Sequence, residues 1–352
     1  MNIAVTGYCG TGSSAVNDLL KEYKSCSNGL LENYEHIPLY TPNGLFDLED
    51  KLLIGNNLHR SDEALESFYN GMKRLNDNNF GWFGGYKKHF GNEFMRNVDG
   101  FINEIAEFEF PGKWSYTAKK MRLSPVQFAV DILRTFMGRK TYRNFGEKEI
   151  DSRKKNIRYA FVDEKKFYAS AQKFIQKYFK MTQAKTENTV YDHLVLPHNL
   201  WRIPEYFDDD FRVIVVDRDV RDLFVLGKYV WPSLGSYAPF PREVKKFISF
   251  WKKMRACEKK IDDPRILRIN FEDIVYDYEN TVRIIENFLN LNPSDHIMKK
   301  RYFVPEKSIK NTQNFNIKTK WIREVQQIDR MLPQYVYTFP YRIQTSIKET
   351  FD

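Results

Sequence analysis

Short apolar runs alternate with longer amphipathic stretches at both ends of the chain. The apolar runs are rich in β-branched residues, which is typical of buried strands in a parallel sheet. They lie at residues 3–6, 189–191, 211–216 and 266–270. Residues 242–260 and 271–291 instead have apolar residues at helical spacing. This alternation predicts an α/β fold with a parallel β-sheet flanked by helices.

The segment between the first predicted helix and the second predicted strand has a different composition. Residues 25–190 are rich in Asn, Lys, Phe, Tyr and Trp and contain few strand signals. Helical patterns cover residues 61–74, 93–108, 125–136 and 164–180. We therefore expect residues 1–352 to form a single α/β domain. Within it, residues 25–190 would be a large, mostly helical and aromatic-rich insertion after the first strand and helix.

A glycine-rich turn joins the first predicted strand to the first predicted helix. Its sequence is Gly7-Tyr8-Cys9-Gly10-Thr11-Gly12-Ser13-Ser14, and Ala15 continues into the helix. The backbone N–H groups of such a turn, together with the positive end of the helix dipole, bind phosphate. We expect a nucleotide phosphate to be bound by Gly10, Thr11, Gly12, Ser13, Ser14 and Ala15. The alternative is an ordinary glycine-rich turn between a strand and a helix.

This turn differs at one position from the phosphate-binding loop of ATP- and GTP-hydrolysing enzymes. Gly7, four further residues, Gly12 and two hydroxyl residues match G-x-x-x-x-G-K-[ST], but Ser13 stands where the lysine should be. Without that lysine, nothing in the loop bridges the β- and γ-phosphates. The sequence therefore argues against a kinase or a nucleotide hydrolase.

Charge and composition narrow the choice of ligand. The 352 residues carry a net charge of +9, which suits an anionic ligand or substrate. No nucleic-acid-binding motif accompanies this charge, so we expect no nucleic-acid partner. The three cysteines and six histidines have no metal-ligand spacing, so we expect no metal. No apolar run reaches about 18 residues and the chain starts directly with a strand, so we expect a cytoplasmic protein without a transmembrane segment.

A second group of charges follows the strongest predicted strand. The sequence Asp217-Arg218-Asp219-Val220-Arg221-Asp222 starts where that strand ends. The carboxyl ends of parallel strands are where α/β sheets bind ligands. At such a place the Arg218 guanidinium can bind a phosphate through two parallel hydrogen bonds. The alternative is a solvated helix start in which the arginines and aspartates pair locally.

Together these segments resemble the sulfotransferase family, whose members use 3′-phosphoadenosine 5′-phosphosulfate (PAPS) and have a P-loop-type fold. The resemblance covers residues 1–20 and 190–325, including Phe271-Glu272-Asp273-Ile274 after the last predicted strand. It implies that the first loop holds the 5′-phosphosulfate and that Arg218 holds the 3′-phosphate. It also implies that the basic segment at residues 305–312, with Lys310, closes over the nucleotide. The segment around residues 32–53 is similar to some bacterial members.

The chain departs from the family at two positions. Family members have Lys or Arg where this chain has Gly10, and that cation stabilises charge as the bond to sulfur breaks. Lys228, Lys119 and Lys120 are the candidates to replace it. The family's second 3′-phosphate ligand, a serine, is Leu226 here, so a backbone N–H or a neighbouring lysine would have to take its place.

His193 is the candidate general base, because it follows the predicted strand at residues 189–191 in a place similar to that of the family's catalytic histidine. Imidazole suits this role because its pKa lies near neutral pH. His198 is the rival candidate. Asp192 could orient the imidazole, but we expect it to have a different role, since adjacent residues on a strand point to opposite faces of the sheet.

The function that these features imply is transfer of the sulfuryl group from PAPS to a hydroxyl or amine, with 3′-phosphoadenosine 5′-phosphate (PAP) as the product. Aromatic and lysine-rich stretches at residues 80–90 and 113–120 suggest a carbohydrate acceptor, such as a glycan or glycolipid. The alternative is that these rings form the hydrophobic core of the insertion. The missing cation at Gly10 favours a second hypothesis, a non-catalytic PAP-binding protein on the same fold. A P-loop kinase is a weaker third, and the oligomeric state stays open.

Overall fold

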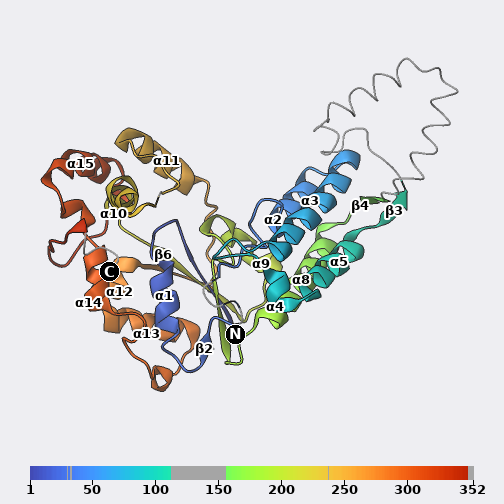
Figure 1. The fold of residues 1–352 in the computed structure, drawn as a ribbon, viewed down its shortest axis with the longest axis horizontal. Coiled ribbons are helices and arrows are strands. Elements are labelled where there is room, and N and C mark those ends of the chain that lie inside the picture. Colours follow the sequence, from blue (N-terminus) through green and yellow to red (C-terminus); the bar gives the residue numbers. More distant parts are fainter. Residues whose placement is uncertain (30, 32–33, 112–155, 237, 348–352) are drawn as a thin grey trace, which may run out of the picture. The chain divides into compact units, whose positions relative to one another are not determined.

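The computed structural model describes residues 1–29, 31, 34–111, 156–236 and 238–347. The chain forms two compact units (Figure 1). The sheet unit consists of Met1–Tyr40, Asn79–Gly84 and Phe179–Asp352, and the helical unit consists of Thr41–Asn78 and Gly85–Tyr178. The helix predicted at residues 125–136 lies outside the described residues, as do Lys119 and Lys120.

The sheet unit contains a five-stranded parallel sheet in the order β2-β5-β1-β6-β7. The strands are β1 (Asn2–Gly7), β2 (Cys26–Ser27), β5 (Asn188–Asp192), β6 (Phe211–Asp217) and β7 (Ile266–Asn270). The prediction of a parallel α/β sheet is therefore confirmed. Since β1 lies between β5 and β6, the residues that follow these three strands emerge side by side at one edge of the sheet.

Helices cover the sheet because their apolar stripes match its buried faces. The helices of this unit are α1 (Ser13–Leu20), α9 (Ile203–Tyr206), α10 (Val220–Val225), α11 (Val244–Ala256), α12 (Phe271–Tyr276), α13 (Tyr278–Leu289), α14 (Pro305–Ser308) and α15 (Ile322–Met331). Side chains of α1, α12 and α13 share one core with β1, β5, β6 and β7. Val16, Ile214 and Ile285 are fully buried in it.

The helix predicted over residues 271–291 is in fact two helices. Asp277 separates α12 from α13, because its backbone leaves the helical region (φ −130°, ψ 51°). At the start of α12, the Asn270 and Asp273 side chains form a reciprocal capping box, which fixes where the helix begins. The break lets α12 follow β7 directly while α13 packs its own apolar stripe on the core.

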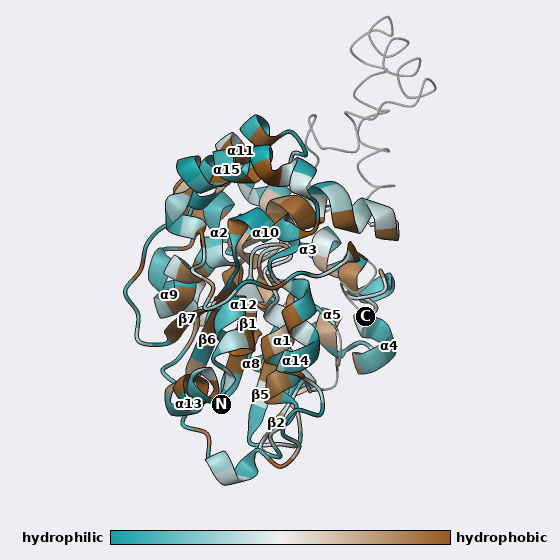
Figure 2. Cartoon of the chain, turned by 90° about the vertical axis from the view of Figure 1, so that its left-hand side faces the viewer, coloured by the Kyte–Doolittle hydropathy of each residue, from teal (hydrophilic) through white to brown (hydrophobic). Residues whose placement is uncertain are grey.

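A second core joins α10, α11 and α15 beside the sheet. Val220, Phe247, Trp251, Trp321 and Ile328 are among its buried members. Figure 2 shows both hydrophobic and hydrophilic residues on α11 and on α15. These two helices therefore bury one side and expose the other.

The helical unit is built from longer helices around an aromatic core. Its elements are α2 (Leu45–Glu49), α3 (Leu58–Asp77), α4 (Tyr86–Phe90), α5 (Glu93–Ile105), β3 (Phe108–Pro111), β4 (Asn156–Tyr159) and α8 (Glu164–Thr182), whose last residues belong to the sheet unit. The helix predicted at residues 93–108 ends at Ile105, because Ala106 is extended and Phe108 begins an antiparallel pair with β4. That small sheet is not predicted by the sequence pattern.

Candidate functional site

The carboxyl edge of the parallel sheet collects the residues singled out in the sequence. The glycine-rich loop follows β1, His193 follows β5, Arg218 follows β6, and Phe271 follows β7. The strand register shows where each strand ends relative to β1: Val5 pairs with Asp192, and Gly7 pairs with Val216. These four segments therefore form one candidate ligand site within the sheet unit.

The loop after β1 adopts the backbone conformation that only glycine accepts readily. Gly10 has φ +80°, and Gly12 has φ +95° and caps the N-terminus of α1. In the first turn of α1, the N–H groups of Ser13 and Ser14 have no intrahelical acceptor, so they can donate to an anion. The N–H groups of Thr11 and Ala15 are instead bonded inside the loop, to the carbonyls of Tyr8 and Gly12, at 3.0 Å each.

The Thr11 hydroxyl also has a structural role in the loop. It is buried and donates to the Tyr8 carbonyl over 2.8 Å. The Ser14 side chain is exposed and the Ser13 side chain is buried. Of the predicted phosphate-binding hydroxyls, Ser14 is thus the one exposed at the helix start.

Two aromatic rings press against the outside of the loop. A Cβ on Gly12 would lie 2.7 Å from Cδ2 of Phe271, and a Cβ on Gly10 would clash with the indole of Trp231. Trp231 begins the turn at Trp231–Leu234. The position where the sulfotransferase family carries its loop cation is therefore packed against a ring, which leaves no room for a long side chain.

Arg218 is buried beside the loop and links it to the segment around Asn311. Its Nη1 donates to the Gly10 carbonyl over 3.0 Å, and its Nη2 donates to the Asn311 carbonyl. Its guanidinium also lies over the Phe271 ring, 4.8 Å from the centroid. Its Nε has no hydrogen-bond partner among the described residues. Because a guanidinium has five N–H donors, three remain for a ligand.

The segment that contains Lys310 is tied to this arginine. Lys310 is exposed and lies in the turn Ile309–Asn311, next to the carbonyl that Arg218 holds. Asp222 fastens the residues that follow, accepting from the Gln313 N–H over 2.7 Å. The predicted nucleotide segment thus lies beside the loop and Arg218 in the structure, while its contact with a ligand stays a prediction.

Asp219 and Asp222 both serve the local structure, as the sequence interpretation of a helix start with Arg–Asp pairs anticipates. The Asp219 carboxylate caps α10 by accepting from the Arg221 and Asp222 N–H groups, and it pairs with the Arg221 guanidinium over 2.7 Å. Burial, and then the charge of Asp219, raise the pKa of Asp222.

Glu272 is buried under the same cluster. Its Oε1 accepts from the Asp219 N–H over 3.0 Å, and its Oε2 has no partner in the described part of the chain. Burial, followed by the charge of Asp219, raises the pKa of Glu272 to about 8, although the Arg218 charge opposes this. A neutral carboxyl group therefore lies behind the site near neutral pH.

His193 lies one strand away from the loop. Its backbone N–H donates to the Val5 carbonyl over 2.9 Å, and its φ of +52° turns the chain sharply after β5. Its Nδ1 lies 2.7 Å from Oδ1 of Asp192. The expectation that Asp192 has a separate role is therefore wrong, because the left-handed turn at His193 ends the strand alternation and brings the two side chains together.

This contact sets the protonation of the imidazole. With Nδ1–H donating to the Asp192 carboxylate, Nε2 carries the lone pair that a general base needs. Burial lowers the pKa of His193, but its hydrogen bond to the Asp192 carboxylate and the charges of Asp192 and Glu35 outweigh burial and raise it. His193 is therefore a stronger base than an isolated imidazole.

His198 is held differently. It lies in the turn Pro197–Arg202, where Nε2 is 3.0 Å from the Met254 carbonyl, and its ring meets the Tyr8 ring edge-on at 5.5 Å. Since a carbonyl only accepts, Nε2 is the protonated nitrogen. His198 thus contacts the back of the loop, and no carboxylate of the described residues lies within hydrogen-bond distance of its ring.

The structure describes some of the residues at issue in the two departures from the family, at Gly10 and Leu226. The Lys228 ammonium lies 2.5 Å from Oε1 of Glu324, so its charge is paired on α15. Leu226 is fully buried in the core of α10, α11 and α15. Lys119 and Lys120 lie outside the described residues, so the replacement cation stays unassigned.

Glu35, Phe271 and Trp231 are site residues that the sequence reasoning missed. Glu35 forms an isolated parallel bridge with Asp192 and faces the His193 charge. Nothing in the sequence near Glu35 signals this, since the contact depends on how the chain returns to the edge of β5. Phe271 had a signal, its place in the Phe-Glu-Asp-Ile segment after a strand.

The predicted aromatic stretch at residues 80–90 divides between the two units. In the helical unit, Tyr86 is fully buried and its ring meets the Phe94 ring edge-on at 4.7 Å, so this part is core. In the sheet unit, Trp82 is 60% exposed. The Trp82 carbonyl accepts from the Glu35 N–H over 2.7 Å, which places the Trp82 backbone beside the segment that forms a bridge with Asp192.

Within the described ranges, no group of three His, Cys, Asp or Glu residues could hold a metal ion. In the same residues, no helix combines the length and the apolar character needed to span a bilayer.

Comparison with known proteins gives distant structural likenesses only. No protein-family model and no curated protein matches the chain. The chain is similar to the sulfotransferase domain from the curacin biosynthetic pathway, with 10% identity, 96% of this chain and 98% of that chain covered, and a TM-score of 0.38. It is also similar to retinol dehydratase in complex with androsterone and the inactive cofactor PAP, with 12% identity, 97% and 82% covered, and a TM-score of 0.30. At such TM-scores these likenesses carry no argument, so function is argued below from this chain's own residues.

Proposed function

We propose that this protein is a PAPS-dependent sulfotransferase, which transfers the sulfuryl group of PAPS to a hydroxyl or amine of an acceptor. One observation carries the proposal. A histidine with its Nδ1 held by a carboxylate at 2.7 Å stands one strand away from a glycine-rich loop at a helix N-terminus. This pairs a base with an anion site at the same edge of the sheet.

The loop and Arg218 would hold the nucleotide. The N–H groups at the start of α1 suit the 5′-phosphosulfate, and the buried Arg218 guanidinium keeps three donors, the unpartnered Nε among them, for the 3′-phosphate. Lys310, in the segment tied to Arg218, would add a cation. These residues fit PAPS, which supplies the activated sulfuryl group when bound.

The proposed reaction needs one proton acceptor and no metal. The acceptor oxygen attacks sulfur while the bond between sulfur and the bridging oxygen of PAPS breaks. The hydroxyl proton passes to Nε2 of His193, and PAP leaves with the bridging oxygen. Asp192 keeps the imidazole in the correct tautomer and stabilises the imidazolium that forms.

We propose a carbohydrate as the acceptor class. Trp82 is exposed, and its backbone carbonyl accepts from the N–H of Glu35, which forms a bridge with Asp192, the chain neighbour of His193. A flat exposed ring can stack on the apolar face of a sugar, with its body buried and its edge in water.

A second candidate, a non-catalytic PAP-binding protein, is favoured by one observation. The Trp231 ring occupies the position next to Gly10 where family members carry a cation, and Lys228 is paired with Glu324. Charge on the leaving oxygen would then have no cation assigned to it among the described residues, although nucleotide binding would be retained.

A transfer assay separates the two. Labelled PAPS would be incubated with the protein and with glycans, glycolipids and phenols, and His193→Asn would be compared with the wild type. A base role predicts a rate about 10²- to 10⁴-fold lower in His193→Asn at unchanged PAP affinity. Transfer that depends on His198 instead would assign the base to the other histidine. Tight PAP binding without transfer to any acceptor would favour the binding protein.

A further inference from the structure

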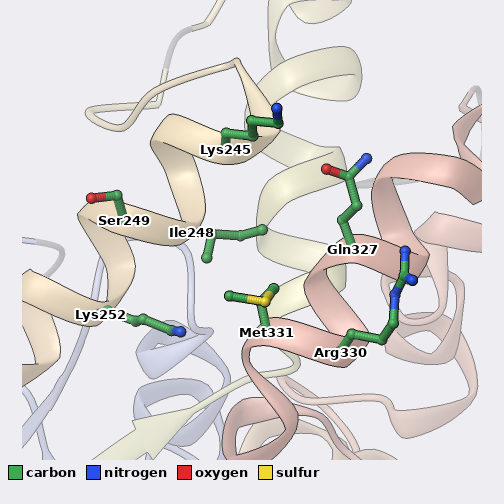
Figure 3. Close-up of a pocket in the computed structure, with 7 residues that line it drawn as sticks. All are labelled: Lys245, Ile248, Ser249, Lys252, Gln327, Arg330 and Met331. Carbon is green, nitrogen blue, oxygen red and sulfur yellow. The ribbon is translucent and has the colours of Figure 1, made fainter.

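A groove between α11 and α15 lies outside the nucleotide site. It has a volume of about 560 Å³, which is in the range of small-molecule sites. It is lined by Lys245, Ile248, Ser249 and Lys252 from α11 and by Gln327, Arg330 and Met331 from α15 (Figure 3). Both helices belong to the sheet unit, so the groove is formed within one compact body.

The groove carries three cations whose charge is not neutralised by neighbours. Among the described residues, Lys245, Lys252 and Arg330 have no carboxylate within salt-bridge distance, and Nε of Arg330 donates only to the Gln326 carbonyl. The sequence of α11 contains no acidic residue. The potential in the groove is therefore positive.

The acidic residues of the opposite helix are all engaged elsewhere. Of the two carboxylates on α15, Glu324 pairs with Lys228 at 2.5 Å and Asp329 pairs with Arg221 at 3.1 Å. Neither can therefore neutralise the lysines of α11 without giving up its present partner.

The floor of the groove is apolar. Ile248 is buried, and Met331 is 49% exposed although it is a large hydrophobic residue. In Figure 3, Met331 lies between Lys252 and Arg330, which come from different helices. An unbranched thioether adapts readily to the shape of an apolar ligand. The combination of a bare apolar floor and flanking cations matches a molecule with an apolar body and a negative head.

We propose that this groove binds a small amphiphilic anion, an alkyl or aryl compound with a phosphate, sulfate or carboxylate head. The head lies between Lys252 and Arg330, and the apolar body lies on Ile248 and Met331. This site is separate from the proposed PAPS site, although Lys252 lies one turn before Arg255, which bonds to Asp217 at the end of β6.

Three probes test the recognition in calorimetric titrations of the full chain. Octyl phosphate, below its micelle concentration, has both head and body; octyl glucoside has the same body without charge; inorganic phosphate has the head alone. We expect saturable one-to-one binding of octyl phosphate only. Equal binding of octyl glucoside, equal binding of inorganic phosphate, or no saturable binding of octyl phosphate would overturn the proposal.

Variants locate the site. Lys252→Gln and Arg330→Gln should each weaken octyl phosphate binding about fivefold, the size of a surface ion pair. Met331→Gln should weaken it as well, by removing apolar contact. Lys253→Gln, an adjacent lysine outside the groove, should have no effect, and an equal effect would refute the location. PAP affinity measured on the same variants should stay unchanged, so failure here is distinct from failure of the proposed function.

Discussion

Oδ1 of Asp192 lies 2.7 Å from Nδ1 of His193, its immediate neighbour in the chain. Two adjacent strand residues would point to opposite faces of the sheet. Here the second residue has φ +52° and no longer belongs to the strand, so both side chains turn to the same side. The left-handed turn of a non-glycine residue costs free energy, which is typical of functional positions.

The pH dependence of transfer should follow this pair. Only neutral imidazole accepts a proton, so the rate should fall as pH drops through the raised pKa of His193. Asp192→Asn keeps an oxygen that accepts from Nδ1 but removes the charge, so the acidic limb of the rate profile should move to lower pH, by about one unit or more. The profile would be measured from pH 5 to about 9.

His198→Asn is the matched control for that experiment, because its ring also borders the loop. It should leave the position of the acidic limb unchanged. An acidic limb that stays in place in Asp192→Asn and moves in His198→Asn would contradict the assignment of the base.

Much of the sheet unit could be predicted from the sequence, because most of its strands are short continuous apolar runs and the helical stretches between them indicate parallel strands. The loop after β1 could also be predicted, because its glycine spacing and the helix that follows are local signals. The contact of Trp231 with Gly10 and that of Glu35 with Asp192 were not, since each joins residues far apart in sequence. The break between α12 and α13 at Asp277 could not be predicted either, because the apolar stripe continues across it.

Gly12 and Gly81 form a matched pair for testing the loop. Gly12 has φ +95° and Gly81 has φ +96°, but a Cβ meets Phe271 only at Gly12 and finds nothing within 4 Å at Gly81. Both alanine variants should lose about 1–2 kcal/mol of stability from backbone strain. Calorimetry should show at least about tenfold weaker PAP binding in Gly12→Ala only. Unchanged PAP affinity in Gly12→Ala would mean that the loop is merely a turn.

The contact between Gly10 and Trp231 should appear in a double-mutant cycle. Gly10→Ala should destabilise the protein more in the wild-type background than in Trp231→Ala, where the ring is gone. The coupling in the free energy of unfolding should be about 0.5–3 kcal/mol. Gly235→Ala, with φ +78° and open space around its Cβ, measures the strain alone. Zero coupling between Gly10 and Trp231 would show that the ring does not press on the loop.

Glu272 should make stability depend on pH. Its pKa is raised in the folded protein from 4.5 to about 8, so its contribution is fully present below about pH 4.5 and is lost as pH rises through 8. Over this range it lowers the free energy of unfolding by at most about 1.4 kcal/mol per pH unit. Glu272→Gln should flatten the profile measured by urea unfolding, and Glu279→Gln, at an exposed carboxylate, should not. Parallel profiles for wild type and Glu272→Gln would refute a buried neutral carboxyl group.

The central claim, that this edge of the sheet binds PAPS, is tested most directly by calorimetric titration of the wild-type protein with PAP and with ATP. The loop at α1 and the Arg218 guanidinium predict saturable one-to-one binding of PAP. Because the loop has Ser13 where a nucleotide hydrolase has lysine, no comparable binding of ATP is expected. ATP binding as tight as that of PAP, or no binding of PAP, would contradict the account.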